Sequence, residues 1–185
     1  MTERGMEIED LPLKGAFIIR PKEFYDERGA FCKTYDRAML RSRGVEPGVV
    51  EEFFSVSKKG VVRGLHYQAE PHPQAKLVGV LKGAAFDVIV DLRRRSPTFG
   101  KWVSVELSGG NRRTLYVPRG FAHGFLSLAD DTLMLYRVDG DYSPEAERGI
   151  IFDDKSLAIP WPKMEYIVSR KDRSWPSFDK ADKFD

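Results

Sequence analysis

His66 is the residue whose type and surroundings point most directly to chemistry. It lies in the segment VVRGLHYQ, where Arg63 and Gln68 are the other strongly polar residues among apolar ones. If this segment is a β-strand, alternate side chains share a face, so His66 and Gln68 point one way and Arg63 the other. An imidazole that faces the interior of a barrel can take up or release a proton near neutral pH. A core histidine that is merely satisfied by a hydrogen bond is the alternative.

Three more polar residues in apolar segments are candidates for the same site. His123 follows a Pro-Arg-Gly turn in PRGFAHGF, so its ring either lines the cavity or packs in the core. Lys76 precedes a strand in QAKLVGV, where its ammonium group either stabilises an oxyanion or lies at an exposed strand edge. Tyr136 lies on an apolar strand face and is either a core tyrosine or a phenol aimed into the cavity. His72, in the proline-rich loop EPHPQ, is interpreted as a solvated residue without a role.

The elements that must hold these residues in place are mainly β-strands. Between residues 80 and 140, apolar residues recur at every second position, which is the period of a half-buried strand. The two clearest apolar faces consist of Phe86, Val88, Val90 and Leu92, and of Val103, Val105 and Leu107. Turn-forming residues recur between these runs at the spacing of an antiparallel barrel or sandwich, so the predicted fold class is mainly β.

The remaining elements are predicted to be few and short. One helix is predicted over residues 36–43, with Asp36 as its N-cap and Gly44 as its stop. From about residue 159 onward the chain is irregular and rich in proline, tryptophan and charge, which predicts a strap packed over the barrel. The length of 185 residues and a hydrophobic fraction of 42% suit a single domain over residues 1–185.

Composition and the absence of common motifs argue against several classes of function. The single cysteine, Cys32, cannot form an intrachain disulfide or a thiolate metal cluster, so a cytoplasmic location is expected. The formal net charge of +2, without long blocks of one sign, argues against nucleic acid or a membrane surface as a partner. The segment MTERGMEIED is charged where a signal peptide would be apolar, and no run approaches the roughly 18 apolar residues of a membrane span. The P-loop, the dinucleotide-binding glycine fingerprint and the Gly-x-Ser-x-Gly elbow are missing as well.

Several longer motifs carry a resemblance that spacing alone does not. The strings RGLHYQ, QAKLV, DVIVDLRRRSPTFGKW, LSGGN, VPRGFAHGF, SPEAERGI and SRKD occur in this order. Over residues 17–172 the chain resembles the dTDP-4-dehydrorhamnose 3,5-epimerase family. The resemblance implies a homodimeric, cupin-type jelly-roll β-barrel that needs no metal or other cofactor. It also implies a nucleotide-linked 4-keto-6-deoxy sugar as substrate, inverted at C3, at C5 or at both on the way to rhamnose.

The family's functional residues fall on matching positions of this chain. The implied catalytic set is the base His66, its orienting carboxylate Asp172, Lys76 beside the keto oxygen and the acid Tyr136. The implied diphosphate-binding set is Arg28 and Arg63, with Lys171 and His123 as further candidates for the site. The resemblance also implies that residues 24–35 cross to a partner subunit and help to complete its nucleotide site.

Five positions depart from the family pattern. Glu51 and Phe53 stand where neutral amides commonly face the nucleotide, and an added carboxylate near a diphosphate is repulsive. The other departures are Ala30, Lys33 and Asp141. Because these positions are expected on the nucleotide side while the proton-transfer residues match, the sequence predicts the reaction type and leaves the identity of the nucleotide open.

Two other functions compete with this interpretation. A metal-dependent cupin isomerase or oxygenase would hold its metal on a His-x-His pair and a glutamate, but the second histidine position is Gln68 in this chain. A non-catalytic cupin that binds sugar nucleotides would keep the arginines without needing the four catalytic residues together. Finding those four residues far apart in the fold would favour the binding protein.

Overall fold

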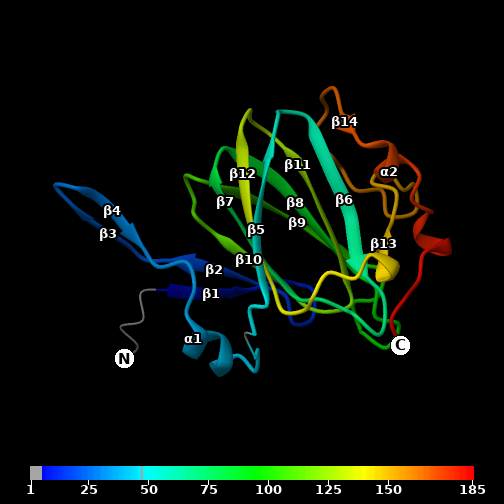
Figure 1. The fold of residues 1–185 in the computed structure, drawn as a ribbon, viewed down its shortest axis with the longest axis horizontal. Helices are drawn as coiled ribbons and strands as arrows, with labels where there is room; N and C mark the ends of the chain where they lie inside the picture. Colours follow the sequence, from blue (N-terminus) through cyan, green and yellow to red (C-terminus); the bar gives the residue numbers. More distant parts are fainter. Residues whose placement is uncertain (1–5, 47) are drawn as a thin grey trace.

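The fold is mainly β, as the sequence predicts (Figure 1). The structure is a computed structural model, and it describes residues 6–46 and 48–185. The strands are β1 (Met6–Asp10), β2 (Phe17–Pro21), β3 (Glu23–Asp26), β4 (Gly29–Cys32), β5 (Glu51–Ser57), β6 (Val61–Gln68), β7 (Lys76–Lys82), β8 (Ala84–Asp91), β9 (Trp102–Ser108), β10 (Thr114–Val117), β11 (Phe121–Ser127), β12 (Thr132–Val138), β13 (Glu147–Gly149) and β14 (Ile167–Val168). The helices are short: α1 (Arg37–Ser42), α2 (Arg170–Arg173) and the 3-10 turns η1 (Pro144–Ala146) and η2 (Phe178–Lys180).

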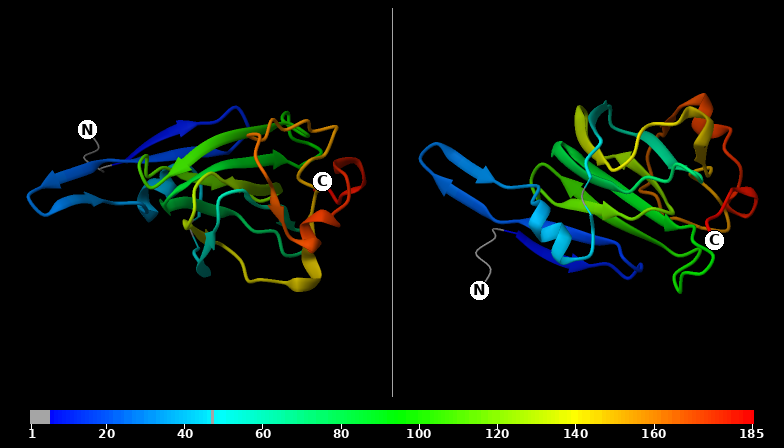
Figure 2. Two further views of the ribbon diagram at one scale, coloured as in Figure 1. Left: turned by 90° about the horizontal axis from the view of Figure 1, so that it is seen from above. Right: turned by 60° about the horizontal axis from the view of Figure 1, so that its bottom comes forward.

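Two sheets make up the body of the protein. The first sheet has the strand order β1-β2-β10-β7-β12-β5, and the second has the order β13-β6-β11-β8-β9, with β14 alongside β6. They pack face to face, because one cluster of buried side chains draws on both (Figures 1 and 2). That cluster includes Ile18, Val78, Leu115 and Met134 from the first sheet and Ile89, Leu107, Phe121 and Phe125 from the second. The predicted apolar face of Val103, Val105 and Leu107 packs into this cluster, which confirms it.

The other face of the second sheet is covered by the C-terminal segment of the chain. The predicted face with Val88 and Val90 points to this side and packs against Phe152 and Trp161. The indole N–H of Trp161 donates to the carbonyl of Phe152 at 2.8 Å, so the tryptophan is buried without losing a hydrogen bond. This packing begins at Ile150, before the irregular region that the sequence places from about residue 159. Figure 2 shows the segment in orange and red along one side of the molecule.

Helix α1 forms where the sequence predicts it. The Asp36 carboxylate accepts a hydrogen bond from the backbone N–H of Met39 at 3.0 Å, which is the N-cap interaction. Gly44 follows the helix with φ +72°, a conformation that glycine adopts without a steric penalty. Met39 and Leu40 bury themselves against Phe17 and its neighbours on the first sheet.

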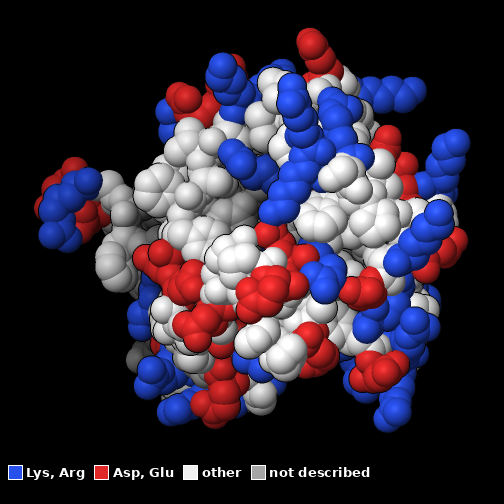
Figure 3. All heavy atoms as spheres, turned by 45° about the vertical axis from the view of Figure 1, so that its right-hand side comes forward, with Lys and Arg blue, Asp and Glu red and all other residues white. Residues whose placement is uncertain are grey.

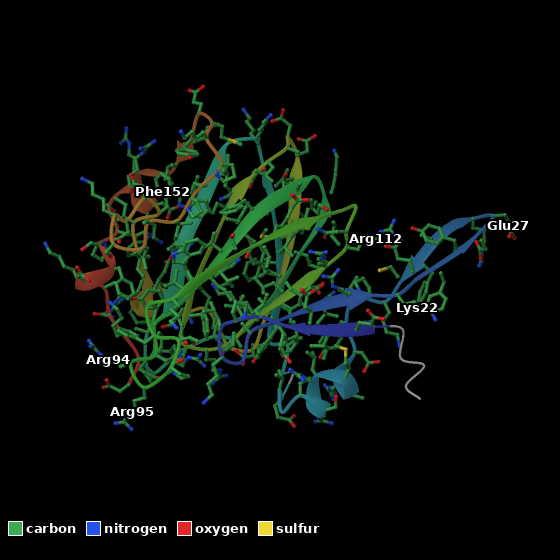
Figure 4. All side chains as sticks on the ribbon, turned by 180° about the vertical axis from the view of Figure 1, so that it is seen from behind. Lys22, Glu27, Arg94, Arg95, Arg112 and Phe152 are labelled. Carbon is green, nitrogen blue, oxygen red and sulfur yellow. The ribbon has the colours of Figure 1, made fainter. Side chains whose placement is uncertain are left out.

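A hairpin formed by β3 and β4 projects away from the two sheets (Figures 1 and 2). Glu27 lies at its tip and Arg112 near its base (Figure 4). Arg112 forms an ion pair with Glu23, which ties the hairpin to the first sheet. The exposed aromatic residues Phe24, Tyr25 and Phe31 lie on the hairpin. None of the helices in the two described ranges has the length and apolar character that a membrane-spanning helix requires.

Candidate active site

A cavity of about 650 Å³ lies between the two sheets, where β5, β7 and β12 of the first sheet face β6 and β11 of the second. The four predicted catalytic residues all line it: His66 on β6, Lys76 on β7, Tyr136 on β12 and Asp172 on α2. Four predicted substrate-binding residues, Phe53, Arg63, His123 and Lys171, line it too. Acidic and basic side chains are interspersed on the face drawn in Figure 3, beside a hollowed area without charged residues.

A β-bulge brings Arg63 and His66 to the same cavity. Along β6 the step from Arg63 to His66 covers three residues, whereas the facing step on β11, from Phe125 to His123, covers two. One extra residue therefore lies in β6, and it reverses the alternation of side chains. The expectation that Arg63 and His66 point to opposite faces is wrong for this reason. The Arg63 guanidinium lies across the cavity wall, where its Nε donates to Ser57 Oγ at 3.1 Å.

Gly64 makes this bulge possible. Its φ is +130°, which an L side chain rarely adopts, and a Cβ atom at this position would lie 2.5 Å from the Cα of Gly124. The close approach of the two glycines lets β6 and β11 stay paired where the extra residue is accommodated.

His66 and Asp172 form a hydrogen-bonded pair, with 2.5 Å between His66 Nε2 and Asp172 Oδ1. Asp172 is buried and His66 is partly exposed to the cavity, with side-chain exposures of 6% and 31%. Trp175 Nε1 donates to the same carboxylate oxygen at 3.2 Å. Burial raises the pKa of Asp172, but the hydrogen bonds from His66, Trp175 and Ser169 outweigh it and leave the pKa below its usual value. The carboxylate therefore stays ionised beside the imidazole ring.

The N-terminus of α2 holds Asp172 in place. Ser169 is the N-cap residue, and its hydroxyl oxygen accepts a hydrogen bond from the Asp172 backbone N–H at 3.0 Å. The strand before it, β14, pairs in parallel with the beginning of β6. Strand β6, which carries His66, therefore also pairs with the strand that leads into α2 and positions Asp172.

Lys76 and His123 line the inner wall of the cavity, and Asp87 lies buried behind His123. The two carboxylate oxygens of Asp87 lie 3.0 and 2.9 Å from His123 Nε2, and both residues are buried. Burial lowers the pKa of Lys76 to about 8, although the carboxylates of Asp87 and Glu147 act in the opposite direction. Asp87 was not among the predicted site residues, although it is an acidic residue in an apolar strand and begins the quoted motif DVIVDLRRRSPTFGKW.

Tyr136 faces the cavity from the opposite sheet to His66. Its ring stacks on Phe53 with 5.0 Å between the ring centroids, and its hydroxyl lies 3.4 Å from Ser55 Oγ. Burial raises the pKa of the phenol above its usual value, so the group stays protonated at neutral and mildly alkaline pH.

Glu147, Lys171 and Tyr142 form a polar cluster at the edge of the cavity. Lys171 Nζ lies 2.6 Å from a Glu147 carboxylate oxygen, and the Tyr142 hydroxyl donates to the same oxygen at 2.7 Å. Sequence reasoning selected Lys171 and missed the other two, although Glu147 lies within the quoted motif SPEAERGI. Glu51 does not line the cavity; its carboxylate accepts from the backbone N–H of Tyr142 at 2.8 Å.

The other predicted nucleotide-side positions lie elsewhere. Arg28 is on the projecting hairpin, paired with Asp26 and largely exposed, so its own chain does not bring it into the cavity. Ala30 is on the same hairpin, and Lys33 follows it and pairs with Asp36 at 3.5 Å. The backbone carbonyl of Asp141 accepts from the amide groups of Gln68 and Gln74.

The four catalytic candidates thus meet in one cavity, which is the outcome that disfavours a merely binding protein. Among the residues that the structure describes, no group of three or more His, Cys, Asp or Glu side chains is arranged to hold a metal ion.

Comparisons with known proteins agree on one family. Residues 10–180 match the family model described as dTDP-4-dehydrorhamnose 3,5-epimerase. A protein of that name from Methanothermobacter thermautotrophicus is 46% identical over 166 residues, which cover 88% of this chain and 89% of the relative.

Solved structures agree as well. The crystal structure of the enzyme of that name from Elizabethkingia anophelis superposes with a TM-score of 0.91 at 42% identity, covering 95% of this chain and 98% of the other. A dTDP-6-deoxy-D-glucose 3,5-epimerase from Legionella pneumophila, solved in complex with dTDP-4-keto-L-rhamnose, gives a TM-score of 0.91 at 42% identity and covers 96% and 95% of the two chains.

Proposed function

This chain belongs to the dTDP-4-dehydrorhamnose 3,5-epimerase family, and on that premise we propose which of its residues move protons and which hold the substrate. It is an isomerase that epimerises a dTDP-linked 4-keto-6-deoxy sugar in dTDP-rhamnose biosynthesis. Membership of the family does not favour a metal-dependent or a non-catalytic cupin. The convergence of His66, Asp172, Lys76 and Tyr136 on one cavity carries the assignment of residues.

His66 is the base in the proposed mechanism. Its Nε2 faces Asp172, so the ring nitrogen left to accept a proton from the sugar is Nδ1. The ionised carboxylate orients the ring and stabilises the imidazolium that forms when the proton arrives.

Lys76 stabilises the intermediate. A proton next to the 4-keto group is acidic only to the extent that the resulting enolate is stabilised. Lys76 is half-buried in the inner wall, where less water screens the charge of its ammonium group than at the surface. It therefore favours the negative oxygen of the enolate. The transfers change no oxidation state, so the reaction as proposed needs no redox cofactor.

Tyr136 is the acid. It faces the cavity from the first sheet while His66 faces it from the second, so the two groups can reach opposite faces of a sugar ring bound between them. The C=C electron pair of the enolate takes the phenol proton to form the new C–H bond, and a lone pair of the enolate oxygen re-forms the carbonyl. One turnover leaves a protonated His66 and a Tyr136 phenolate, and exchange with water returns both to their starting states.

The nucleotide part of the substrate is proposed to occupy the outer part of the cavity. Arg63 and Lys171 supply positive charge for the diphosphate, and His123 supplies a further polar contact beside the sugar. Glu51 and Phe53 are proposed to border this part, Glu51 through the backbone of Tyr142 and Phe53 directly. The carboxylates of Glu51 and Glu147 limit how closely a diphosphate approaches on that side.

A homodimer completes the proposed site. Arg28 is remote from the cavity of its own chain, but the projecting hairpin places it where a second copy can receive it. The exposed Phe24 and Phe31 on the hairpin supply apolar surface for that contact. Closed two-fold symmetry is the commonest form of oligomer. A cytoplasmic location is proposed as well, on the single cysteine of the chain.

Incubation with dTDP-4-keto-6-deoxyglucose in heavy water tests the function and counts the reacting carbons. The expected result is an inverted product with deuterium at both C3 and C5, detected by mass spectrometry and proton NMR. Deuterium at one carbon would restrict the chain to single-carbon epimerisation. Neither product nor exchange would overturn the catalytic assignment.

A further inference from the structure

The environment of Tyr136 is set by the neighbouring edge strand, β5. Tyr136 on β12 lies directly opposite Phe53 on β5, and the two strands pair without a shift of register. Because side chains alternate along a strand, Phe53, Ser55 and Ser57 share the face that points toward the cavity. Phe54 and Val56 point to the opposite side, where they are exposed.

Tyr136 is held between three groups. The Phe53 ring stacks on the phenol ring with an interplanar angle of 17°, and the His123 ring approaches edge-on with 6.2 Å between centroids. Ser55 Oγ lies beside the phenol oxygen. Of these three neighbours Phe53 is the outermost, because it is 46% exposed whereas Ser55 is half-buried and His123 is buried. Phe53 therefore covers the tyrosine on the side of the solvent.

A proton donor must be held within hydrogen-bond reach of one face of its acceptor to be effective. The hydroxyl of Tyr136 is at the far end of the side chain, so a small swing about the χ1 angle would displace it, and the contact with Ser55 at 3.4 Å is long for a hydrogen bond. Stacking on Phe53 restricts that swing, because rotation of the ring would break the face-to-face contact.

We propose that Phe53 is a positioning residue for inversion: by stacking on Tyr136 it decides how often the enolate is protonated on the new face. This inference rests on the proposed function, in which Tyr136 is the acid and His66 the base. Phe53 has no acidic or basic group and therefore exchanges no proton with the substrate. Phe53 stands where the family commonly has a neutral amide, so the stacking of an aromatic ring on Tyr136 is a feature of this chain.

The positioning role of Phe53 predicts a measurable change in the ratio of proton exchange to inversion. Once the enolate has formed, it has two proton donors, the protonated His66 on the old face and Tyr136 on the new one. Return of a proton from His66 after exchange with solvent labels the substrate without inverting it. Loss of Phe53 slows only the second route, so the ratio of exchange to inversion rises while deprotonation continues. A residue that only binds the nucleotide would change KM and leave this ratio unaltered.

The test compares Phe53→Leu with the matched control Phe54→Leu. Both remove an exposed ring from β5, but only the first removes the stacking partner of Tyr136. Initial rates in heavy water give deuterium at C5 in recovered substrate and in inverted product. We expect Phe53→Leu to raise the exchange-to-inversion ratio about 2- to 10-fold, the effect of one aromatic pair. Phe54→Leu should keep the parental ratio. Phe53→Trp, which restores a flat ring without an acidic hydroxyl, should recover it.

Each outcome decides the matter. A parental ratio in Phe53→Leu, or a raised KM with an unaltered ratio, would overturn the inference and leave Phe53 as a binding residue. If Phe53→Leu does not fold, as judged by circular dichroism, Phe53→Met gives the same comparison with a side chain of similar volume. The proposed function is checked separately with Tyr136→Phe in the same assay. Inversion by that variant at the parental rate would refute the acid assignment itself, whereas exchange without inversion leaves Phe53 as the only point in question.

Discussion

At the scale of single residues, the site contains two histidine–carboxylate pairs with different exposures. His66 is accessible from the cavity and has a carboxylate on one ring nitrogen only. His123 is buried, and Asp87, also buried, places both oxygens against it. Burial raises the pKa of Asp87, while the neighbouring His123 and Lys76 act to lower it, so the three groups are coupled. The accessible pair, His66 and Asp172, can exchange a proton with the substrate. The buried pair, His123 and Asp87, holds the His123 ring in a fixed position in the cavity wall.

The base assignment predicts a graded loss in two variants. His66→Asn should reduce exchange of the C5 proton by about 100-fold or more, because the general base is gone, while nucleotide binding is retained. Asp172→Asn should cost less, roughly 10- to 100-fold, because the amide still accepts the imidazole hydrogen bond but cannot stabilise the imidazolium. Deuterium uptake at C5, followed by mass spectrometry, measures both. Parental exchange in the His66 variant would assign the base to another residue.

Lys76 predicts an alkaline limb in the pH profile. Burial lowers its pKa to about 8, so the ammonium form is present below that pH and is lost above it. Tyr136 stays protonated over this range because burial raises its pKa. We therefore expect kcat/KM to fall tenfold per pH unit above about pH 8. Lys76→Arg keeps a positive charge throughout, so its residual activity should lack this limb. A limb that persists in Lys76→Arg would belong to a different group.

At the scale of elements, the bulge in β6 is the feature that organises the cavity. It turns Arg63 and His66 to one side although three positions separate them. The extra residue fits only because Gly64 adopts φ +130° directly against Gly124. A regular strand in the same place would direct Arg63 away from the cavity and remove a guanidinium from the proposed diphosphate site.

Gly64→Ala should therefore be strongly destabilising. The added methyl group meets the Gly124 backbone at 2.5 Å and an alanine is strained at this φ, so we expect a loss of about 2–5 kcal/mol in the free energy of unfolding. Gly110→Ala is the matched control, since its Cβ would meet only Ser108 Oγ at 3.7 Å. Thermal or urea unfolding compares the two. Equal stability of both variants would mean that the two strands shift apart at little cost.

The elements themselves were predictable from the sequence where local physics determines them. Alternation identified the faces of β8 and β9, and the Asp36 cap and Gly44 identified α1. The bulge was not predictable, because a glycine in a strand does not reveal which partner approaches it. The pairing of His66 with Asp172 spans 106 positions, so motif matching indicated it and periodicity could not. Glu147 and Tyr142 were missed because a charged residue and a tyrosine in a loop resemble ordinary surface residues.

At the scale of the whole molecule, the projecting hairpin separates Arg28 from the cavity that it is proposed to serve. A hairpin with exposed aromatic residues would gain stability by packing against a second copy, as the proposed dimer requires. In that arrangement each cavity would contain residues of both subunits. The activity would then depend on the dimer and not on the single chain.

Mixing two weakened variants tests this arrangement. In Arg28→Ala the donated arginine is missing, and in His66→Ala the base is missing. If Arg28 acts on the partner, a hybrid dimer has one intact site, and an equal mixture refolded together should recover about one quarter of parental activity at low substrate concentration. The unmixed variants and a mixture without refolding are the controls. No recovery would mean that Arg28 acts on its own chain or not at all, and a monomer in sedimentation would rule out the dimer.

The position of Asp172 along the chain also bears on how the protein comes to be made. The strands of both sheets are synthesised before α2, because each of them precedes Asp172 in the sequence. Domains begin to fold while synthesis continues, so the sheets can assemble around an unpartnered His66. The nascent polypeptide would then expose a nearly complete cavity that binds the nucleotide but cannot yet turn it over. Catalytic competence would arrive only when the covering segment has docked and brought Asp172 to His66, so binding and turnover would be acquired at different stages of folding.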